Sequence, residues 1–132
     1  MNLADRCDGV VIDEVPAMGF NMFNHQEKIF RSDRINEKIL ATHLAALKEL
    51  VDRDFNLPCV AMRSSGNEAA TDEPESEPYF KAVAAATRKL DSSRPITLVQ
   101  SSYDSEDRVA QHFDVVCGTD TIPGTRKPDG SI

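Results

Sequence analysis

The chain has 132 residues, a formal net charge of −7 at pH 7 and a hydrophobic content of 40%. This length and apolar content suit one domain with a buried core and argue against disorder throughout. The negative charge argues against binding to nucleic acid, whose phosphates attract basic patches, and against attraction to anionic membranes. No hydrophobic run approaches the roughly 20 residues that span a bilayer. The N-terminus also lacks a secretory signal, so we expect a soluble cytoplasmic protein.

Four short apolar runs predict β-strands. They are Val10–Ile12, Cys59–Met62, Ile96–Val99 and Phe113–Cys117. The first is interpreted as a buried strand, and Asp13 and Glu14 follow it directly.

Helical patterns separate these strands. The predicted helices occupy the first nine residues, about 36–53, about 78–90, and a short stretch at 105–112. Gly9 is expected to close the first helix in a left-handed conformation. The 36–53 segment repeats apolar residues at three- and four-residue steps, as an amphipathic helix does. His43 borders that apolar stripe and is interpreted as a packed or partly exposed histidine, not a metal ligand. Residues 17–37 are expected to form a long loop.

Alternation of apolar strands with helices predicts an α/β fold with a parallel sheet covered by helices. Right-handed crossovers place the carboxyl ends of all strands on one edge, where ligands bind in open sheets and in eight-stranded barrels. The polar residues expected at this edge are Asp13, Glu14, Asn67, Glu68 and Gln100.

The Asn67–Glu68 pair is the main candidate for chemistry at this edge. An amide beside a carboxylate can bind a sugar hydroxyl while the acid serves the bond being cut. Glycoside hydrolysis uses two carboxyl groups, which lie about 5 Å apart in retaining enzymes. We therefore expect Glu68 to be the catalytic acid/base and Asn67 to bind substrate. Asp13 and Glu14 are candidates for support at the rim, with a solvated strand end or a helix cap as the alternative.

Metal-ligand spacing is absent from the cysteines and histidines. Cys7, Cys59 and Cys117 are odd in number and widely separated, as are the three histidines. Cysteines inside apolar strands more often act as small buried hydrophobes. We therefore expect no metal site.

Several blocks of the sequence, in order, resemble the catalytic domain of glycoside hydrolase family two. The blocks are 9–16, 43–54, 60–70, 87–91 and 94–97, and the resemblance covers about residues 3 to 117. Within the family the chain is most similar to bacterial, gut-type β-glucuronidases. In that family the Asn-Glu pair after the fourth barrel strand is the acid/base motif, which corresponds to Asn67 and Glu68.

The resemblance implies that residues 1–117 form a partial (β/α)8 TIM barrel, about strands three to six with their helices. It implies a fragment of a retaining β-glucuronidase that hydrolyses β-D-glucuronides without a cofactor. The nucleophilic glutamate belongs to a seventh strand, beyond Ile132, so we expect this chain alone to be inactive. Full-length relatives are expected to be homo-oligomers. The open strand edges of half a barrel lead us to expect marginal stability or self-association of the fragment.

Two alternatives remain open from the sequence. One is a non-catalytic half-barrel remnant, acting as a weak sugar-binding or interaction module. The other keeps the family but changes the sugar, as in a β-galactosidase or β-mannosidase.

Three positions depart from the family pattern. Arg63 stands where the acid/base strand usually carries tryptophan, and Phe55 and Leu57 stand where lysine and histidine are usual. An unpartnered arginine in a buried strand costs several kcal/mol, so Arg63 is expected to be paired or at the rim.

Residues 118–132 depart from the family more abruptly. This segment is polar and rich in glycine and proline, and we expect it to be disordered. Read from the third base of the Gly118 codon, the shifted triplets permit asparagine, arginine, tyrosine, tyrosine, serine, tryptophan and tyrosine, a motif typical of the family. We therefore hypothesise a frameshift near Gly118, which the DNA sequence would test.

Overall fold

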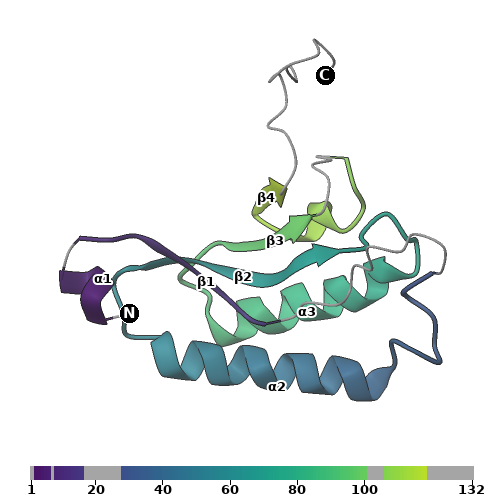
Figure 1. Ribbon diagram of the computed structural model, residues 1–132, viewed down its shortest axis with the longest axis horizontal. Coiled ribbons are helices and arrows are strands. Elements are labelled where there is room, and N and C mark those ends of the chain that lie inside the picture. Colours follow the sequence, from purple (N-terminus) through teal and green to yellow (C-terminus); the bar gives the residue numbers. More distant parts are fainter. Residues whose placement is uncertain (1, 7, 17–27, 101–105, 119–132) are drawn as a thin grey trace, which may run out of the picture.

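The computed structural model describes residues 2–6, 8–16, 28–100 and 106–118 (Figure 1). Its elements follow in the order α1 (Asn2–Arg6), β1 (Val11–Glu14), α2 (Glu37–Asp54), β2 (Val60–Ala69), α3 (Ser76–Leu90), β3 (Ile96–Gln100), a 3-10 turn η1 (Ala110–His112) and β4 (Val115–Gly118). The predicted alternation of strands and helices is confirmed. Gly118, the first residue of the predicted disordered tail, instead belongs to β4 and pairs with Gln100. The rest of the predicted tail lies outside the described residues.

The strands form one parallel sheet in the order β1-β2-β3-β4, so each strand pairs with the next one along the chain. Both long helices, α2 and α3, lie on the same side of this sheet (Figure 1). A doubly wound sheet would carry helices on both faces, whereas successive strands with helices on one side form the wall of a barrel. The predicted partial barrel is confirmed, with its carboxyl-terminal strand ends on one edge.

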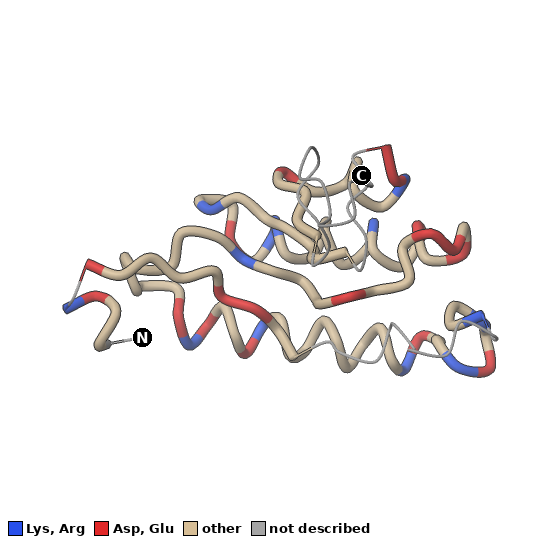
Figure 2. The backbone as a smooth tube through the Cα atoms, turned by 45° about the horizontal axis from the view of Figure 1, so that its top comes forward, with Lys and Arg blue, Asp and Glu red and all other residues tan. Residues whose placement is uncertain are grey.

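Helix α2 begins where Asn36 caps it. Asn36 has extended backbone angles, and its Oδ1 accepts hydrogen bonds from the backbone N–H groups of Lys38 (3.1 Å) and Ile39 (3.3 Å). This satisfies donors that the first helical turn leaves without partners. Charged positions gather at the two ends of α2, and residues 39–47 carry no charge (Figure 2). The uncharged middle can therefore pack against α3 and the sheet.

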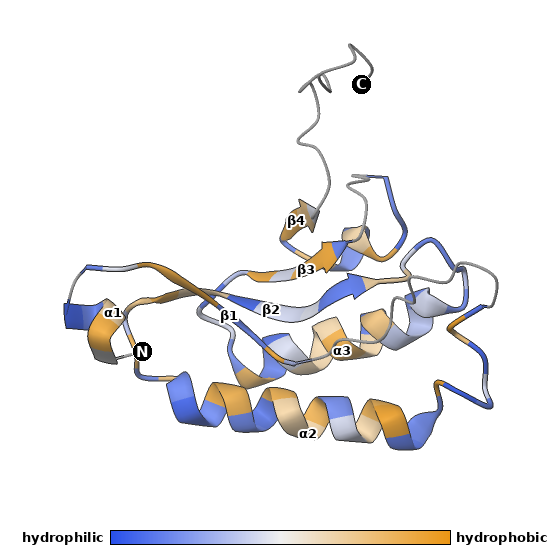
Figure 3. Cartoon of the chain, viewed as in Figure 1, coloured by the Kyte–Doolittle hydropathy of each residue, from blue (hydrophilic) through white to orange (hydrophobic). Residues whose placement is uncertain are grey.

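The hydrophobic core lies between the sheet and these two helices. Its fully buried members include Leu47 of α2, Phe80 and Val83 of α3, and Ile96 of β3, each 0% exposed. Figure 3 shows that apolar residues recur along both helices and that β3 is mostly hydrophobic. By contrast, β2 is hydrophilic over much of its length. The polar residues of β2 therefore need explanations other than core packing.

The segment before α2 is held to the start of α3 by one carboxylate. Glu73 accepts backbone hydrogen bonds from Ile29 and Phe30, both at 2.8 Å. The Phe30 ring then makes edge-on contacts with Tyr79 and Phe80, with centroids 5.6 and 5.7 Å apart. Part of the predicted loop is thus fixed against α3, while residues 17–27 lie outside the described residues.

Three sequence expectations about local structure are wrong. The first strand is not buried, since Val10 is 79% and Ile12 52% exposed. The reason is its position, because β1 is an edge strand of the described sheet. The left-handed residue after α1 is Asp8, with φ of 54°, and not Gly9. The predicted helix at 105–112 is, over the described residues, only the turn η1.

Candidate active site

The carboxyl end of β2 contains two irregularities in its pairing with β3. Ser64 pairs with Thr97, Asn67 with Val99, and Ala69 with Gln100. Over these pairs β2 advances by three residues and then two, while β3 advances by two and then one. Each step therefore inserts one extra residue into β2, as a β-bulge does. Bulges bend a strand and redirect side chains, and they are common beside active sites.

Glu68 occupies the second of these bulges with a backbone that glutamate seldom adopts. Its φ is +50°, in the left-handed region. Placing an L-residue with a Cβ there costs roughly 1–2 kcal/mol, and such strain persists only where the surrounding structure imposes it. The strand therefore holds Glu68, the predicted acid/base residue, in a backbone conformation that glutamate does not favour by itself.

The Asn67 and Glu68 side chains are both half-buried. Within the described part of the chain, neither side chain has a hydrogen-bond or ion-pair partner. An amide and a carboxylate held in this way at the carboxyl edge of a parallel sheet are available to a ligand. Their predicted roles as substrate-binding and acid/base groups stay predictions.

Asp13 lies among buried charges on the helix side of β2. It is 4% exposed, and its Oδ2 accepts a 2.6 Å hydrogen bond from Arg63, which is 0% exposed. Arg63 also donates to Asp91 (3.2 Å) and to the backbone carbonyl of Asp54 (3.3 Å). The expectation that Arg63 is paired is confirmed. We call Asp13, Arg63, Asp91 and Arg94 the arginine cluster.

Arg94 completes the arginine cluster by donating to Asp91 (2.9 Å) and to the backbone carbonyl of Val60 (2.7 Å). Burial raises the pKa of Asp91, but hydrogen bonds from Ser93, Arg94 and Arg63 outweigh it and lower the pKa to about 2. For Asp13, burial and the nearby Asp54 raise the pKa despite the attraction of Arg63. Asp13 thus already has a protein partner, and a part in rim support stays a prediction.

Glu14 differs from its neighbour because its side chain is exposed. Its Oε2 accepts a 2.7 Å hydrogen bond from Ser64 Oγ, in the residue that precedes the first bulge. The carboxyl end of β1 is therefore tied to β2 just before the segment that bears Asn67 and Glu68. Rim support by Glu14 stays a prediction as well.

His43, which the sequence predicts to be packed or partly exposed, lies in direct contact with β2. It contacts residues 64–69, the part of β2 that holds both bulges, which we call the bulged segment. His43 of α2 is buried, and its ring nitrogens lie 2.9 Å from the Ser65 carbonyl oxygen and 3.0 Å from the Tyr79 hydroxyl. In the sequence, His43 lies one turn before Leu47 on the buried stripe of α2. A polar ring at such a position needs hydrogen-bond partners, which was the one sign of this contact. Tyr79 had no signal beyond its position in a helix.

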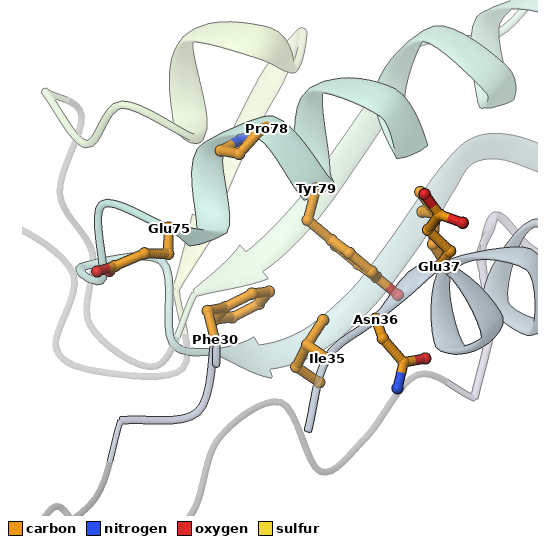
Figure 4. Close-up of a pocket in the computed structure, with 8 residues that line it drawn as sticks. Phe30, Ile35, Asn36, Glu37, Glu75, Pro78 and Tyr79 are labelled. Carbon is orange, nitrogen blue, oxygen red and sulfur yellow. The ribbon is translucent and has the colours of Figure 1, made fainter. Parts of the chain in front are cut away.

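A pocket of about 280 Å³ lies on the helix side, and neither Asn67 nor Glu68 lines it. It is lined by Phe30, Ile35, Asn36, Glu37, Leu40, Glu75, Pro78 and Tyr79. In Figure 4 the Tyr79 ring forms one wall of this pocket and extends from α3 toward the start of α2. The lining is mainly apolar and holds no arrangement of catalytic groups, so the bulged segment remains the candidate site.

The described ranges contain no group of three or more His, Cys, Asp or Glu residues that could hold a metal ion. In the same ranges, no helix combines the length and apolar character needed to cross a bilayer.

Comparisons with known proteins agree with this geometry. Residues 1–122 match the family model described as glycosyl hydrolases family 2, TIM barrel domain. The chain is 49% identical over 117 residues to a β-glucuronidase of Paenibacillus borealis, covering 89% of this chain and 20% of that protein. The solved β-D-glucuronidase of Dictyoglomus thermophilum superposes with a TM-score of 0.83 at 46% identity, covering 88% of this chain and 20% of that one.

A third similar protein was solved with a sugar acid. It is the β-glucuronidase of Ruminococcus gnavus in complex with D-glucuronic acid, which has a TM-score of 0.72 at 30% identity and covers 89% of this chain and 19% of that chain. The chain thus spans about one fifth of the length of the relatives that it matches.

Proposed function

Since this chain belongs to glycosyl hydrolase family 2, within its TIM barrel domain, we propose that it is the part of a retaining β-glucuronidase that carries the acid/base carboxylate. The observation that carries the proposal is Glu68, held at φ +50° in a bulge at the carboxyl end of β2, beside Asn67. The names of the similar proteins favour β-D-glucuronides over galactosides or mannosides as the substrate class.

In the proposed mechanism Glu68 first donates a proton to the glycosidic oxygen as the bond to the sugar breaks. It then removes a proton from the water that releases the sugar from the enzyme, since the same group serves as acid and base in retaining enzymes. Asn67 would hold a sugar hydroxyl while these transfers occur. The second carboxylate, the nucleophile, would come from a strand outside the four described here.

The test is a chimera in which residues 1–117 replace the matched segment of the Paenibacillus borealis enzyme, assayed with an aryl β-D-glucuronide. We expect activity, and we expect Glu68→Gln to lower kcat by about 10²–10⁴-fold, the usual contribution of a general acid/base. Glu49→Gln, on the exposed side of α2, is the matched control and should leave kcat unchanged.

Three outcomes would contradict the proposal. Unchanged activity in Glu68→Gln would remove the acid/base role. Hydrolysis of a β-galactoside or β-mannoside in preference to the glucuronide would change the substrate class. An inactive chimera would favour the non-catalytic half-barrel.

The 132-residue chain assayed alone should show no turnover, because it would lack the nucleophile.

We also propose that the 132-residue chain self-associates through β1. Val10 and Ile12 leave apolar surface open at this edge, and unpaired strand edges recruit other strands. Sedimentation over a range of concentrations should show a rising mean mass, which Ile12→Lys should reduce. A monomer at all concentrations would argue against this.

A further inference from the structure

The bulged segment is held from the helix side by a chain of hydrogen bonds. Ser65 lies between the paired residues Ser64 and Asn67, and it is 0% exposed. Its carbonyl oxygen lies 2.9 Å from His43 Nε2, and His43 Nδ1 lies 3.0 Å from the Tyr79 hydroxyl. His43 belongs to α2 and Tyr79 to α3. Each long helix therefore contributes one link to the segment that ends in Glu68.

The chemistry of the partners sets the direction of these bonds. A carbonyl oxygen can only accept, so Nε2 of His43 carries the hydrogen and donates it to Ser65. Burial lowers the pKa of His43, which keeps the ring neutral and leaves Nδ1 as an acceptor. Burial also raises the pKa of Tyr79 well above its usual value, so its hydroxyl stays protonated and donates to Nδ1. The chain runs from the Tyr79 O–H through the imidazole to the Ser65 carbonyl.

We infer that His43 and Tyr79 are positioning residues for the acid/base carboxylate, acting through the Ser65 carbonyl on the bulged backbone of Asn67 and Glu68. The inference rests on the proposed function of Glu68.

We infer that these hydrogen bonds keep the strained backbone of Glu68 in place. A residue at positive φ returns to an ordinary conformation unless nearby contacts prevent it. Ser65 is only three residues before Glu68, and its hydroxyl also lies 3.4 Å from that of Thr87 on α3. Fixing the backbone of Ser65 limits how the extra residues of the bulges can rearrange. The packing of α2 against α3 then fixes the position of the Glu68 carboxylate.

The first test needs no activity. In the 132-residue chain, ¹⁵N NMR of the His43 ring should show a neutral ring with hydrogen on Nε2. Tyr79→Phe should shift the ring Nδ1 resonance and the backbone amide resonances of residues 66–68. Val83→Ala is the control, because Val83 is fully buried on the same helix and its side chain lies outside the chain of bonds. Hydrogen on Nδ1, a charged ring at pH 7, or unmoved amides at 66–68 would overturn the inference.

The second test uses the chimera. Misplacement of a catalytic group by about 1 Å can cost about 10²-fold in rate, so Tyr79→Phe and His43→Leu should lower kcat by roughly ten- to a hundredfold with KM little changed. His43→Gln, whose amide can still donate to Ser65, should recover part of the loss. Val83→Ala should lower the melting temperature without this fall in kcat.

The outcomes separate the two proposals. If Glu68→Gln leaves activity intact, the proposed function fails. If Glu68→Gln abolishes activity while Tyr79→Phe and His43→Leu keep the original kcat, only the positioning role is overturned. Equal losses in Val83→Ala and Tyr79→Phe, with no rescue by His43→Gln, would show that the loss comes from stability alone and overturn it as well.

Discussion

The middle of β2 and its carboxyl-terminal part both carry polar groups, but the surroundings of these groups differ. In the middle of the strand Arg63 is 0% exposed, and two carboxylates and a backbone carbonyl accept its hydrogen bonds. In the carboxyl-terminal part Asn67 and Glu68 are half-buried, without side-chain partners in the described part of the chain, and Glu68 has a strained backbone.

This contrast separates structural polarity from functional polarity within one strand. Buried charges that satisfy one another hold the sheet to the helix ends, and removing one of them leaves the others without compensation. Polar groups kept open at a strained position add nothing to stability, and strain of this kind gathers at functional sites. Variants in these two parts of β2 should therefore change stability in different ways.

The largest expected effect on stability is at the arginine cluster. Arg63→Met should lower the free energy of unfolding by about 3–5 kcal/mol, because it leaves Asp13 and Asp91 buried without their common partner. Urea unfolding of the 132-residue chain measures it. Lys48→Met is the matched control, since Lys48 pairs with Asp52 on the exposed side of α2 and should change stability by less than about 0.5 kcal/mol. Similar losses in both variants would contradict the structural role of the cluster.

A smaller effect should appear with pH. The pKa of Asp91 falls from 3.8 to about 2 on folding, which corresponds to about 2 kcal/mol of stability. Because the folded-state pKa is the lower one, this contribution is present above pH 4 to 5 and disappears as the pH falls toward 2. Asp91→Asn should flatten the loss of unfolding free energy between pH 5 and pH 2. An unchanged pH profile would show that Asp91 is not held ionised by the cluster.

The smallest effect tests the strain in the carboxyl-terminal part of β2. Glycine tolerates positive φ and alanine does not, so Glu68→Gly should be more stable than Glu68→Ala by about 1 kcal/mol. At Glu49, inside α2, the order should reverse, with alanine favoured by about 1 kcal/mol. Thermal unfolding of the four variants measures both differences. Alanine favoured at both positions would mean that Glu68 is not held at positive φ.

Much of the fold followed from local patterns. The apolar stripe of α2 and the four short apolar runs indicate where helices and strands form, and their alternation implies a parallel sheet. The exposure of β1 could not be predicted, because an apolar run such as Val10–Ile12 looks the same in an edge strand and a central one. Edge position depends on which strands are neighbours in space.

The candidate site was predictable only in part. The Asn67–Glu68 pair stands out because its residue types follow a strand, and the resemblance to a family assigns it a role. The bulges depend on register against β3, which no property of β2 alone encodes. The partners of Arg63 lie 50 and 28 residues away in sequence, so the need for a partner was predictable but its identity was not. The contact of His43 with Ser65 also depends on how α2 sits on the sheet.

The extra residues in β2 have a consequence for comparing related sequences. In a strand, side chains alternate between the two faces, so a change of one residue in length reverses every position that follows. Loss of one residue between Ser64 and Ala69 would therefore reverse the facing of the positions beyond it, even if the Asn-Glu dipeptide were kept intact. Among relatives, the spacing across this segment should be a better indicator of retained glycosidase chemistry than the presence of the two residues alone.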